Sequence, residues 1–328
     1  MTQESARKKP GKNLIQRLFS LSYSGLIIIT LVLVILLSVV TPNNAFLQPN
    51  NLLNVLRQVS VYGIMAVGMA FVMISGGIDL SVGSVAGFSG CVTSLLVTNE
   101  VMSLMPSMLV GVVSGLLSGV ICGLIIAYTG IPPFITTLSV QISVRGLAYI
   151  VANGKPIGNL PKNLLNLGVG SVFGVPIPII FMVLFLLMGA LILNRTTFGR
   201  TVYAVGGNRT AAHLAGVNVK KVTILVYTIS GVVSAFAGIV LASRNVSAQP
   251  NAGVAFETEA IAGCAMGGVA FDGGSGSMSG VALGIILMGI INNGMNLLGI
   301  SSYWQLVVKG LIMVTAVIYS MRNSKRNA

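Results

Sequence analysis

SYSGLIIITLVLVILLSVVT, at residues 22–41, is an almost wholly apolar stretch without a charged side chain. A helix needs about 20 apolar residues to cross the hydrocarbon core of a bilayer. The stretch is therefore predicted to be a retained membrane-spanning helix; it is too long for a cleaved signal peptide and lacks a clear small-residue cleavage site. About ten segments of the chain have a similar character. They are 22–41, 54–76, 81–98, 107–128, 132–152, 176–194, 221–243, 257–271, 277–298 and 303–321.

The composition points to a polytopic membrane protein. The 328 residues are 54% hydrophobic and 8% charged, with a mean hydropathy of +0.92, whereas a soluble globular protein carries about 25% charged residues. Long apolar runs and the lack of a short repeat exclude disordered and collagen-like chains. We predict an all-α bundle of about ten transmembrane helices. It forms one domain over 22–321, flanked by a basic tail at 1–21 and a short tail at 322–328.

The net charge of +13 comes from 19 basic and 6 acidic residues. In a soluble domain this balance would suggest nucleic acid, but in a membrane protein Lys and Arg mark the cytoplasmic loops. With the amino terminus inside and about ten alternating spans, both termini are predicted to be cytoplasmic, and no nucleic acid partner is expected. The predicted inside bases are Arg7, Lys8, Lys9, Lys12, Arg17, Arg195, Arg200, Arg209, Lys220, Lys221, Arg322, Lys325 and Arg326, and the outside ones are Lys155, Lys162 and Arg244.

Two loops are longer than the others. The inner loop, 195–220, is polar, and residues 208–216 are predicted to form a short helix with Asn208 as its N-cap and Gly216 as its stop. A short helix on the cytoplasmic face of a bundle is a natural docking element. The outer loop, 153–175, contains prolines, asparagines and glycines and is predicted to be an irregular cap.

Glycines recur every fourth residue in the predicted span 107–128. Gly111, Gly115, Gly119 and Gly123 fall on one helix face, where they let a neighbouring backbone approach closely. We expect tight helix packing there, which does not distinguish a channel from a transporter.

SGGIDLSVG, at 75–83, interrupts two apolar runs and carries one of the few acids of the chain, Asp79. A carboxylate inside a bilayer costs about 3 kcal/mol, so Asp79 is expected to face protein, water or the interface. It is predicted either to cap the next span from an interfacial turn or to act as a gate or partner contact. GGVAFDGGSGSMSG, at 267–280, has a similar texture around Asp272.

Amide side chains within the spans are candidates for contact with a hydroxylated solute, because amides both donate and accept hydrogen bonds. The alternative is hydrogen bonding between helices. Asn292 and Asn296, four residues apart, are predicted to share a helix face. The amides considered are Gln58, Gln141, Asn292, Asn293 and Asn296, and the candidates for the solute path are Gln58, Asn292, Asn293 and Asn296.

No catalytic, metal or cofactor site is predicted. Cys91, Cys122 and Cys264 lie far apart in apolar runs, without metal-ligand spacing. GFSG at 87–90 matches a motif of intramembrane serine proteases, but the single histidine, His213, lies in the predicted inner loop, away from any such nucleophile. The chain contains no GxxxxGK[ST] motif that would hold a nucleotide phosphate.

Taken in order along the chain, several motifs resemble those of the membrane permeases of bacterial ABC importers for monosaccharides, such as ribose, galactose, xylose and arabinose. The resemblance runs from about residue 50 almost to the end of the chain, and it is nearest to ribose-type permeases. The motifs are SGGIDLSVG (75–83), PPFITTL (132–138), FGRTVYAVGGNRTAAHLAGVNVKK (198–221), VSAQPNAG (246–253) and NNGMNLLGISSYWQLVVKG (292–310).

This resemblance implies a multi-pass protein of the bacterial inner membrane that works by alternating access. It implies three partners: a cytoplasmic ABC ATPase subunit, an extracytoplasmic sugar-binding protein, and a second permease copy or a paralogue. The stretch 203–217 matches the family's cytoplasmic loop that contacts the ATPase. The matching positions, Gly207, Asn208, Ala211, Ala212 and Gly216, are the predicted coupling residues.

A self-sufficient secondary transporter or channel is the alternative. A proton-coupled symporter normally needs titratable groups inside the membrane. In the sequence, Asp79, Arg57 and Arg145 are poor candidates for such a relay, and Glu257 and Glu259 fall at the entrance of a predicted span.

Overall fold

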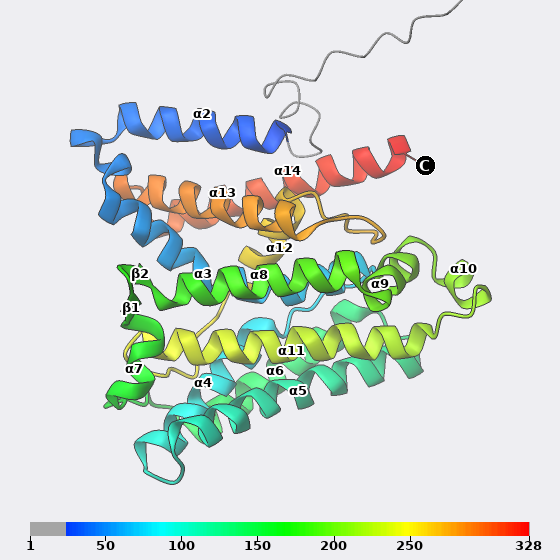
Figure 1. Cartoon of the computed structure of the whole chain (residues 1–328), viewed down its shortest axis with the longest axis horizontal. Coiled ribbons are helices and arrows are strands. Elements are labelled where there is room, and N and C mark those ends of the chain that lie inside the picture. Colours follow the sequence, from blue (N-terminus) through cyan, green and yellow to red (C-terminus); the bar gives the residue numbers. More distant parts are fainter. Residues whose placement is uncertain (1–23, 328) are drawn as a thin grey trace, which may run out of the picture.

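Long helices lie side by side along the longest axis of the molecule in the computed structural model, which describes residues 24–327 (Figure 1). The tail predicted at 1–21 lies outside the described residues. The elements are α2 (Ser24–Val40), η1 (Pro42–Leu47), α3 (Pro49–Ile74), α4 (Val82–Thr98), α5 (Leu104–Thr129), α6 (Pro133–Val151), α7 (Lys162–Val169), β1 (Ser171–Val172), β2 (Val175–Pro176), α8 (Ile177–Arg195), α9 (Thr197–Gly207), α10 (Arg209–Leu214), α11 (Val219–Arg244), α12 (Phe256–Met266), α13 (Met278–Leu297) and α14 (Ser302–Asn327).

Prolines and polar caps fix where several helices begin. A proline occupies the first or second position of α3, α6 and α8, where its missing N–H costs no helical hydrogen bond. The side chain of Asn218 accepts from the Lys221 N–H at 3.0 Å to cap α11. Ser277 caps α13 by accepting from the Gly280 N–H at 3.1 Å. These local contacts satisfy backbone groups that a helix end leaves free.

The two ends of the bundle differ. One end, the α10 end, carries α9, α10 and the carboxyl end of α14; the other, the α7 end, carries α7, β1 and β2 (Figure 1). Strands β1 and β2 pair antiparallel across Phe173 and Gly174, whose φ angles of +50° and +80° suit a tight hairpin. The prediction of an irregular cap over 153–175 was therefore wrong, because a helix and a hairpin form there.

Most of the predicted spans correspond to single helices. Within the described residues, six helices are long and apolar enough to cross a membrane, namely α3, α5, α6, α8, α11 and α13. Helices α2 and α4 are apolar but have 17 residues each. Helix α12 has 11 residues and is only about 16 Å long, too short to cross a core of about 30 Å. The expectation of a full spanning helix over 257–271 is thus corrected.

Helices α3 and α11 form the centre of the bundle. Every residue of α3 from Val59 to Ile74 is buried, and a helix that is apolar on all sides belongs in a core. The outer helices keep large apolar side chains exposed, such as Ile35 of α2 and Leu187 of α8, both more than 60% exposed. In an all-α membrane protein these outer side chains face lipid.

The glycine stripe of α5 packs against α11 and α4. All four glycines are buried, and at each of them a Cβ atom would collide with a neighbouring helix. Helices α5 and α11 therefore touch backbone to backbone, as small residues permit. The colliding partners are Thr93 for Gly111, Gly231 for Gly115, Tyr227 for Gly119 and Ile224 for Gly123.

Two helices, α4 and α12, begin inside the bundle instead of at its ends. Non-helical segments lead into them, residues 75–81 into α4 and residues 245–255 into α12. The first turns of the two helices meet, because a Cβ on Gly83 would lie 2.5 Å from Glu257 Oε2 and would collide with the carbonyl oxygen of Gly253. The bundle thus contains two interrupted crossings whose helical parts start at a shared point.

The two glycine-rich turns with similar texture are neighbours at the α10 end. The Gly274 N–H donates to the Ile74 carbonyl at 2.8 Å, and a Cβ on Gly76 would lie 3.4 Å from the Asp272 carbonyl oxygen. Gly206 of α9 completes this contact, since a Cβ there would strike both Ile74 and Gly274. We call Ile74, Gly76, Gly206 and Gly274 the glycine junction.

Replacing Gly119 by valine tests the backbone contact between α5 and α11. The added side chain has no space against Tyr227 and Thr228, and overpacking of this kind costs about 1–3 kcal/mol. The Gly119→Val protein is expected to unfold at a lower temperature than the parent when both are purified in detergent. Gly146→Ala is the control, because Gly146 of α6 has no atom within 4 Å of its Cβ position. Equal melting temperatures for parent, Gly119→Val and Gly146→Ala would contradict this packing.

Candidate functional site

Helices α9 and α10 form a compact elbow at the α10 end (197–216). The predicted short helix forms as α10, and the Asn208 side chain caps it by accepting from the Ala211 N–H at 2.9 Å. The sequence did not predict α9, which is capped by Thr196 accepting from the Gly199 N–H at 3.0 Å. Gly216 ends the elbow with a φ of +85°, a conformation that favours glycine.

The five predicted coupling residues lie together at the elbow but do not face the same way. Gly207, Asn208, Ala211 and Gly216 are on its surface. Ala212 is 5% exposed and packs into the core, so its side chain cannot serve as a contact for another protein. The elbow also exposes a large apolar side chain, that of Leu214, which is 82% exposed.

The elbow is tied to the glycine junction. Gly206, near the end of α9, is the elbow's part of that junction. The Tyr203 hydroxyl donates to the Gly276 carbonyl at 2.9 Å. Helix α9 is therefore in direct contact with the segments that connect α3 to α4 and α12 to α13.

Asp79 lies deep in the bundle and not at its surface. Its side chain accepts from the Ser81 N–H and hydroxyl at 2.9 and 2.6 Å and from the Ser230 hydroxyl at 2.7 Å. Ser230 lies near the middle of the 26-residue helix α11. Asp79 is 1% exposed, so the carboxylate holds the entry to α4 against α11 from inside the bundle, and its role as a gate stays a prediction.

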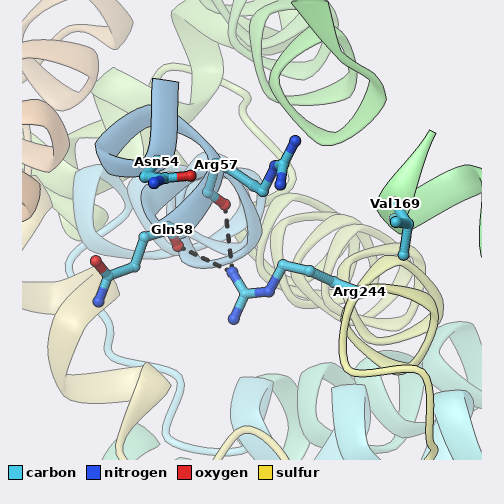
Figure 2. Close-up of a pocket in the computed structure, with 6 residues that line it drawn as sticks. Asn54, Arg57, Gln58, Val169 and Arg244 are labelled. Atoms are coloured by element: carbon cyan, nitrogen blue, oxygen red, sulfur yellow. Dashed lines mark hydrogen bonds between the residues drawn. The ribbon is translucent and has the colours of Figure 1, made fainter. Parts of the chain in front are cut away.

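Gln58 lines a cavity of about 290 Å³ at the α7 end, where Figure 2 shows it. The guanidinium of Arg244 reaches from α11 to α3 and donates to the carbonyl oxygens of Arg57 and Gln58 at 3.3 and 3.2 Å (Figure 2). Arg57 Nε is buried and has no hydrogen-bond partner. The lining contains no acid, so this cavity is positively charged. Its lining residues are Asn54, Arg57, Gln58, Gly168, Val169 and Arg244.

The three asparagines of α13 divide into two groups. Asn293 exchanges hydrogen bonds of 2.9 and 3.0 Å with Asn51 of α3. These contacts join two helices, the alternative role considered above. Asn292 instead donates to Glu259 of α12 at 3.4 Å. Asn296 accepts from Gln305 of α14 at 2.8 Å. Asn292 and Asn296 thus both face the α12–α14 side.

The sequence did not predict that ionisable side chains gather around α12. Lys309 of α14 pairs with Glu259 at 2.5 Å, where the two side chains are 29% and 10% exposed. Gln141 of α6 donates to Glu257 at 3.2 Å. Arg145 of α6 donates to the carbonyl oxygens of Pro250 and Ala252, at 2.7 and 2.6 Å. The start of α12 is therefore held by polar groups from α6 on one side and from α13 and α14 on the other.

A signal for this layer was present in the sequence. Two acids and two bases, Glu257, Glu259, Arg145 and Lys309, fall in or beside apolar segments, where charge is expensive and marks a pairing or a pathway. The two acids were assigned to a span entrance because 257–271 was expected to cross the membrane. Spacing along the chain could not show that they meet residues 50 and more than 100 positions away.

Metal and thiol chemistry find no support in the described part of the chain. Residues 24–327 contain no group of three or more His, Cys, Asp or Glu side chains placed to hold a metal ion. Cys91, Cys122 and Cys264 are free and buried. What the interior offers is hydrogen bonding and charge.

Comparison with known proteins gives a consistent result. A family model described as branched-chain amino acid transport system / permease component matches residues 51–317. The ribose import permease protein of Bacillus subtilis (strain 168) is 42% identical over 295 residues, which are 89% of this chain and 91% of that protein. The L-arabinose transport system permease protein of Escherichia coli (strain K12) is 43% identical over 301 residues, 92% of this chain and 91% of that protein.

A further relative is described as an L-arabinose ABC transporter permease protein. It comes from Azospirillum brasilense and is 37% identical over 305 residues, 92% of this chain and 89% of that protein. No solved structure matches the chain.

Replacing Lys309 by methionine tests the ion pair that ties α14 to α12. The change leaves Glu259 buried without its counter-ion, and breaking a buried pair in this way costs about 3–5 kcal/mol. The Lys309→Met protein is expected to unfold at a lower temperature than the parent, and its α14 should be cleaved more readily in limited proteolysis. The double variant Lys309→Met/Glu259→Met should recover much of the loss, because no unpaired charge remains. If the single and double variants melt alike, the pair does not hold α14.

Proposed function

Because the chain belongs to the branched-chain amino acid transport system / permease component family, we propose that it is the transmembrane permease subunit of an ATP-binding cassette importer for a monosaccharide, with a ribose-like sugar as the leading assignment. The observation that carries the proposal is the similarity to ribose and L-arabinose permeases, 42% and 43% identity over about nine tenths of each chain. The chain is then a transport subunit, and ATP is hydrolysed on a separate subunit.

The α10 end faces the cytoplasm of a bacterial inner membrane in this proposal, with both termini on that side. The bases of the elbow and its flanks, among them Arg195, Arg209 and Lys220, support this orientation through the excess of Lys and Arg on cytoplasmic loops. The number of crossings in this proposal is still about ten. Helix α12 and the segments 245–255 and 267–277 together count as one crossing, because they connect α11 at the α7 end to α13 at the α10 end.

The partners follow from this orientation. The ABC ATPase subunit docks on the α9–α10 elbow, and the exposed Leu214 supplies an apolar contact. The sugar-binding protein delivers its load at the α7 end. A second permease copy or a paralogue completes the translocation path.

Alternating access requires that a movement of the ATPase changes the positions of the helices that line the translocation path. The elbow touches the glycine junction through Gly206, and the junction adjoins the segments next to both interrupted helices. Closure of the ATPase subunits would shift α9, and through it α4 and α12. The smooth contact between α5 and α11 suits such sliding, because glycines leave few interlocking side chains.

A self-sufficient secondary transporter or channel is the second candidate, and one observation favours it. Glu257 and Glu259 are buried within the bundle, where titratable carboxylates can serve a proton relay. Ribose uptake into proteoliposomes separates the two functions. We expect uptake only when the ATPase, ATP and the sugar-binding protein are all present. Uptake by the purified chain alone under a proton gradient would instead establish the second candidate.

Replacing Leu214 by glutamate tests the docking surface. Leu214 is 82% exposed, so the charge is tolerated in the folded permease but removes the apolar contact with the ATPase. We expect the ATPase to be lost on co-purification, while membrane insertion and the melting temperature stay unchanged. Ala211→Glu is the matched variant on the same helix, and it should weaken association less, because alanine offers a smaller contact. Full retention of the ATPase by Leu214→Glu would overturn the docking assignment.

A further inference from the structure

The two non-helical segments that enter the bundle differ in their surroundings. Residues 75–81 are buried or half-buried throughout. Asn251, Val254 and Ala255, at the end of the other segment, are exposed. Within a membrane, non-helical backbone is tolerated only where protein buries it or where it lines a water-filled cavity. The first segment meets the first condition. This chain alone does not bury the second segment, so either a water-filled cavity or a second subunit must cover it.

The exposed surface continues onto the first turn of α12. Thr258 is exposed there, and its hydroxyl donates to the Ala255 carbonyl at 2.6 Å, which leaves the oxygen free to accept. Ala255 holds a φ of +66°, a strained conformation for a residue other than glycine. Such strain persists where the surrounding structure enforces it, and often at ligand sites.

This surface lies at membrane depth. Gln141, whose amide binds Glu257, is ten residues from the α7 end of the 19-residue helix α6, or about 15 Å along the helix. Helix α6 is long and apolar enough to span the membrane. Thr258, next to Glu257, is therefore an exposed polar side chain near the middle of the bilayer and not at its surface.

Two buried polar atoms at this place have no hydrogen-bond partner. Glu257 is 9% exposed, and its Oε2 points between the first turns of α4 and α12, toward Gly83. Arg145 Nη2 is the second such atom. An unmet buried acceptor and donor are costly to keep, and both lie beside the start of α12.

We propose that the α12 entry, formed by Gln141, Arg145, Glu257 and Thr258, is the point where the permease contacts its solute. The solute is a small, neutral molecule with several hydroxyl groups. Its hydroxyls donate to the exposed Thr258 Oγ and accept from the Gln141 amide, and they reach Glu257 Oε2 and Arg145 Nη2 when the first turns of α4 and α12 separate. The identification of the solute as a sugar rests on the proposed function; the location of the site does not.

The assignment replaces Asn293 in the solute path, because both polar groups of that amide are used by Asn51.

Thiol labelling tests the location of the site. Thr258→Cys is placed in the full chain, assembled with its ATPase in proteoliposomes, and treated with a charged, membrane-impermeant methanethiosulfonate with and without ATP. We expect modification at least about tenfold faster than for Leu187→Cys, since a thiol in hydrocarbon forms no thiolate. Leu187 lies near the middle of α8 and is 63% exposed toward lipid. The parent chain is the background, because its three cysteines are buried.

Equal, slow labelling of the two variants in both conditions would overturn the location. So would a disulfide between the Thr258→Cys residues of two permease copies without labelling, because the surface would then be a dry subunit contact. These readouts need no transport, so they decide the location even if the wild-type complex carries no sugar and the proposed function fails.

Transport stoichiometry tests the contact itself. Thr258→Val keeps the side-chain shape but removes the hydroxyl, and we expect ribose moved per ATP hydrolysed to fall about five- to tenfold. A folding defect would lower uptake and ATP hydrolysis together and leave their ratio unchanged. Ser143→Ala is the control, since this exposed serine of α6 hydrogen-bonds only to its own helix, at Ser139 O. An unchanged ratio for Thr258→Val would refute the contact.

Discussion

A peptide group in hydrocarbon has no water to bond with, and the rest of this structure follows from that constraint. Helices satisfy it along most of the chain. At residues 75–81 and 245–255 the helix is broken inside the bundle, so other groups must satisfy the backbone. At the first break, Asp79 accepts from the Ser81 N–H and Thr137 accepts from the Leu80 N–H. At the second, Arg145 binds two carbonyl oxygens. Side chains therefore satisfy backbone groups at both interruptions.

Close backbone contacts connect these breaks to both ends of the molecule. The glycines of α5 bring it against α11, and Gly83 brings the start of α4 against Gly253 and Glu257. At the α10 end, Gly206 joins the elbow to the turns that carry Gly76 and Gly274. Side chains do not separate these elements, so the elbow, the two turns and the starts of α4 and α12 are joined through direct backbone contacts.

Local patterns in the sequence were enough to predict the long helices and the cap of α10. Apolar runs of about twenty residues located α2, α3, α5, α8 and α11, and Asn208 and Gly216 marked α10 because capping depends on neighbours in the chain. The short length of α12 could not be predicted, since 259–271 carries no further charge after Glu259 and the helix ends at Met266, where Gly267 packs closely against Gly280 of α13. Pairings such as Lys309 with Glu259 and Asn51 with Asn293 join distant positions and leave no local trace. The burial of Ala212 depends in the same way on how the elbow packs.

Lys309 and Glu259 enter the membrane at different times during synthesis. The ribosome delivers Glu259 with α12 well before α14 carries Lys309 into the bilayer, because 50 residues separate the two. Until then the acid has only the weak contact with Asn292. Helix α14 thus supplies the counter-ion of Glu259, and a nascent chain that stops short of it leaves this carboxylate in the bilayer without its ion pair.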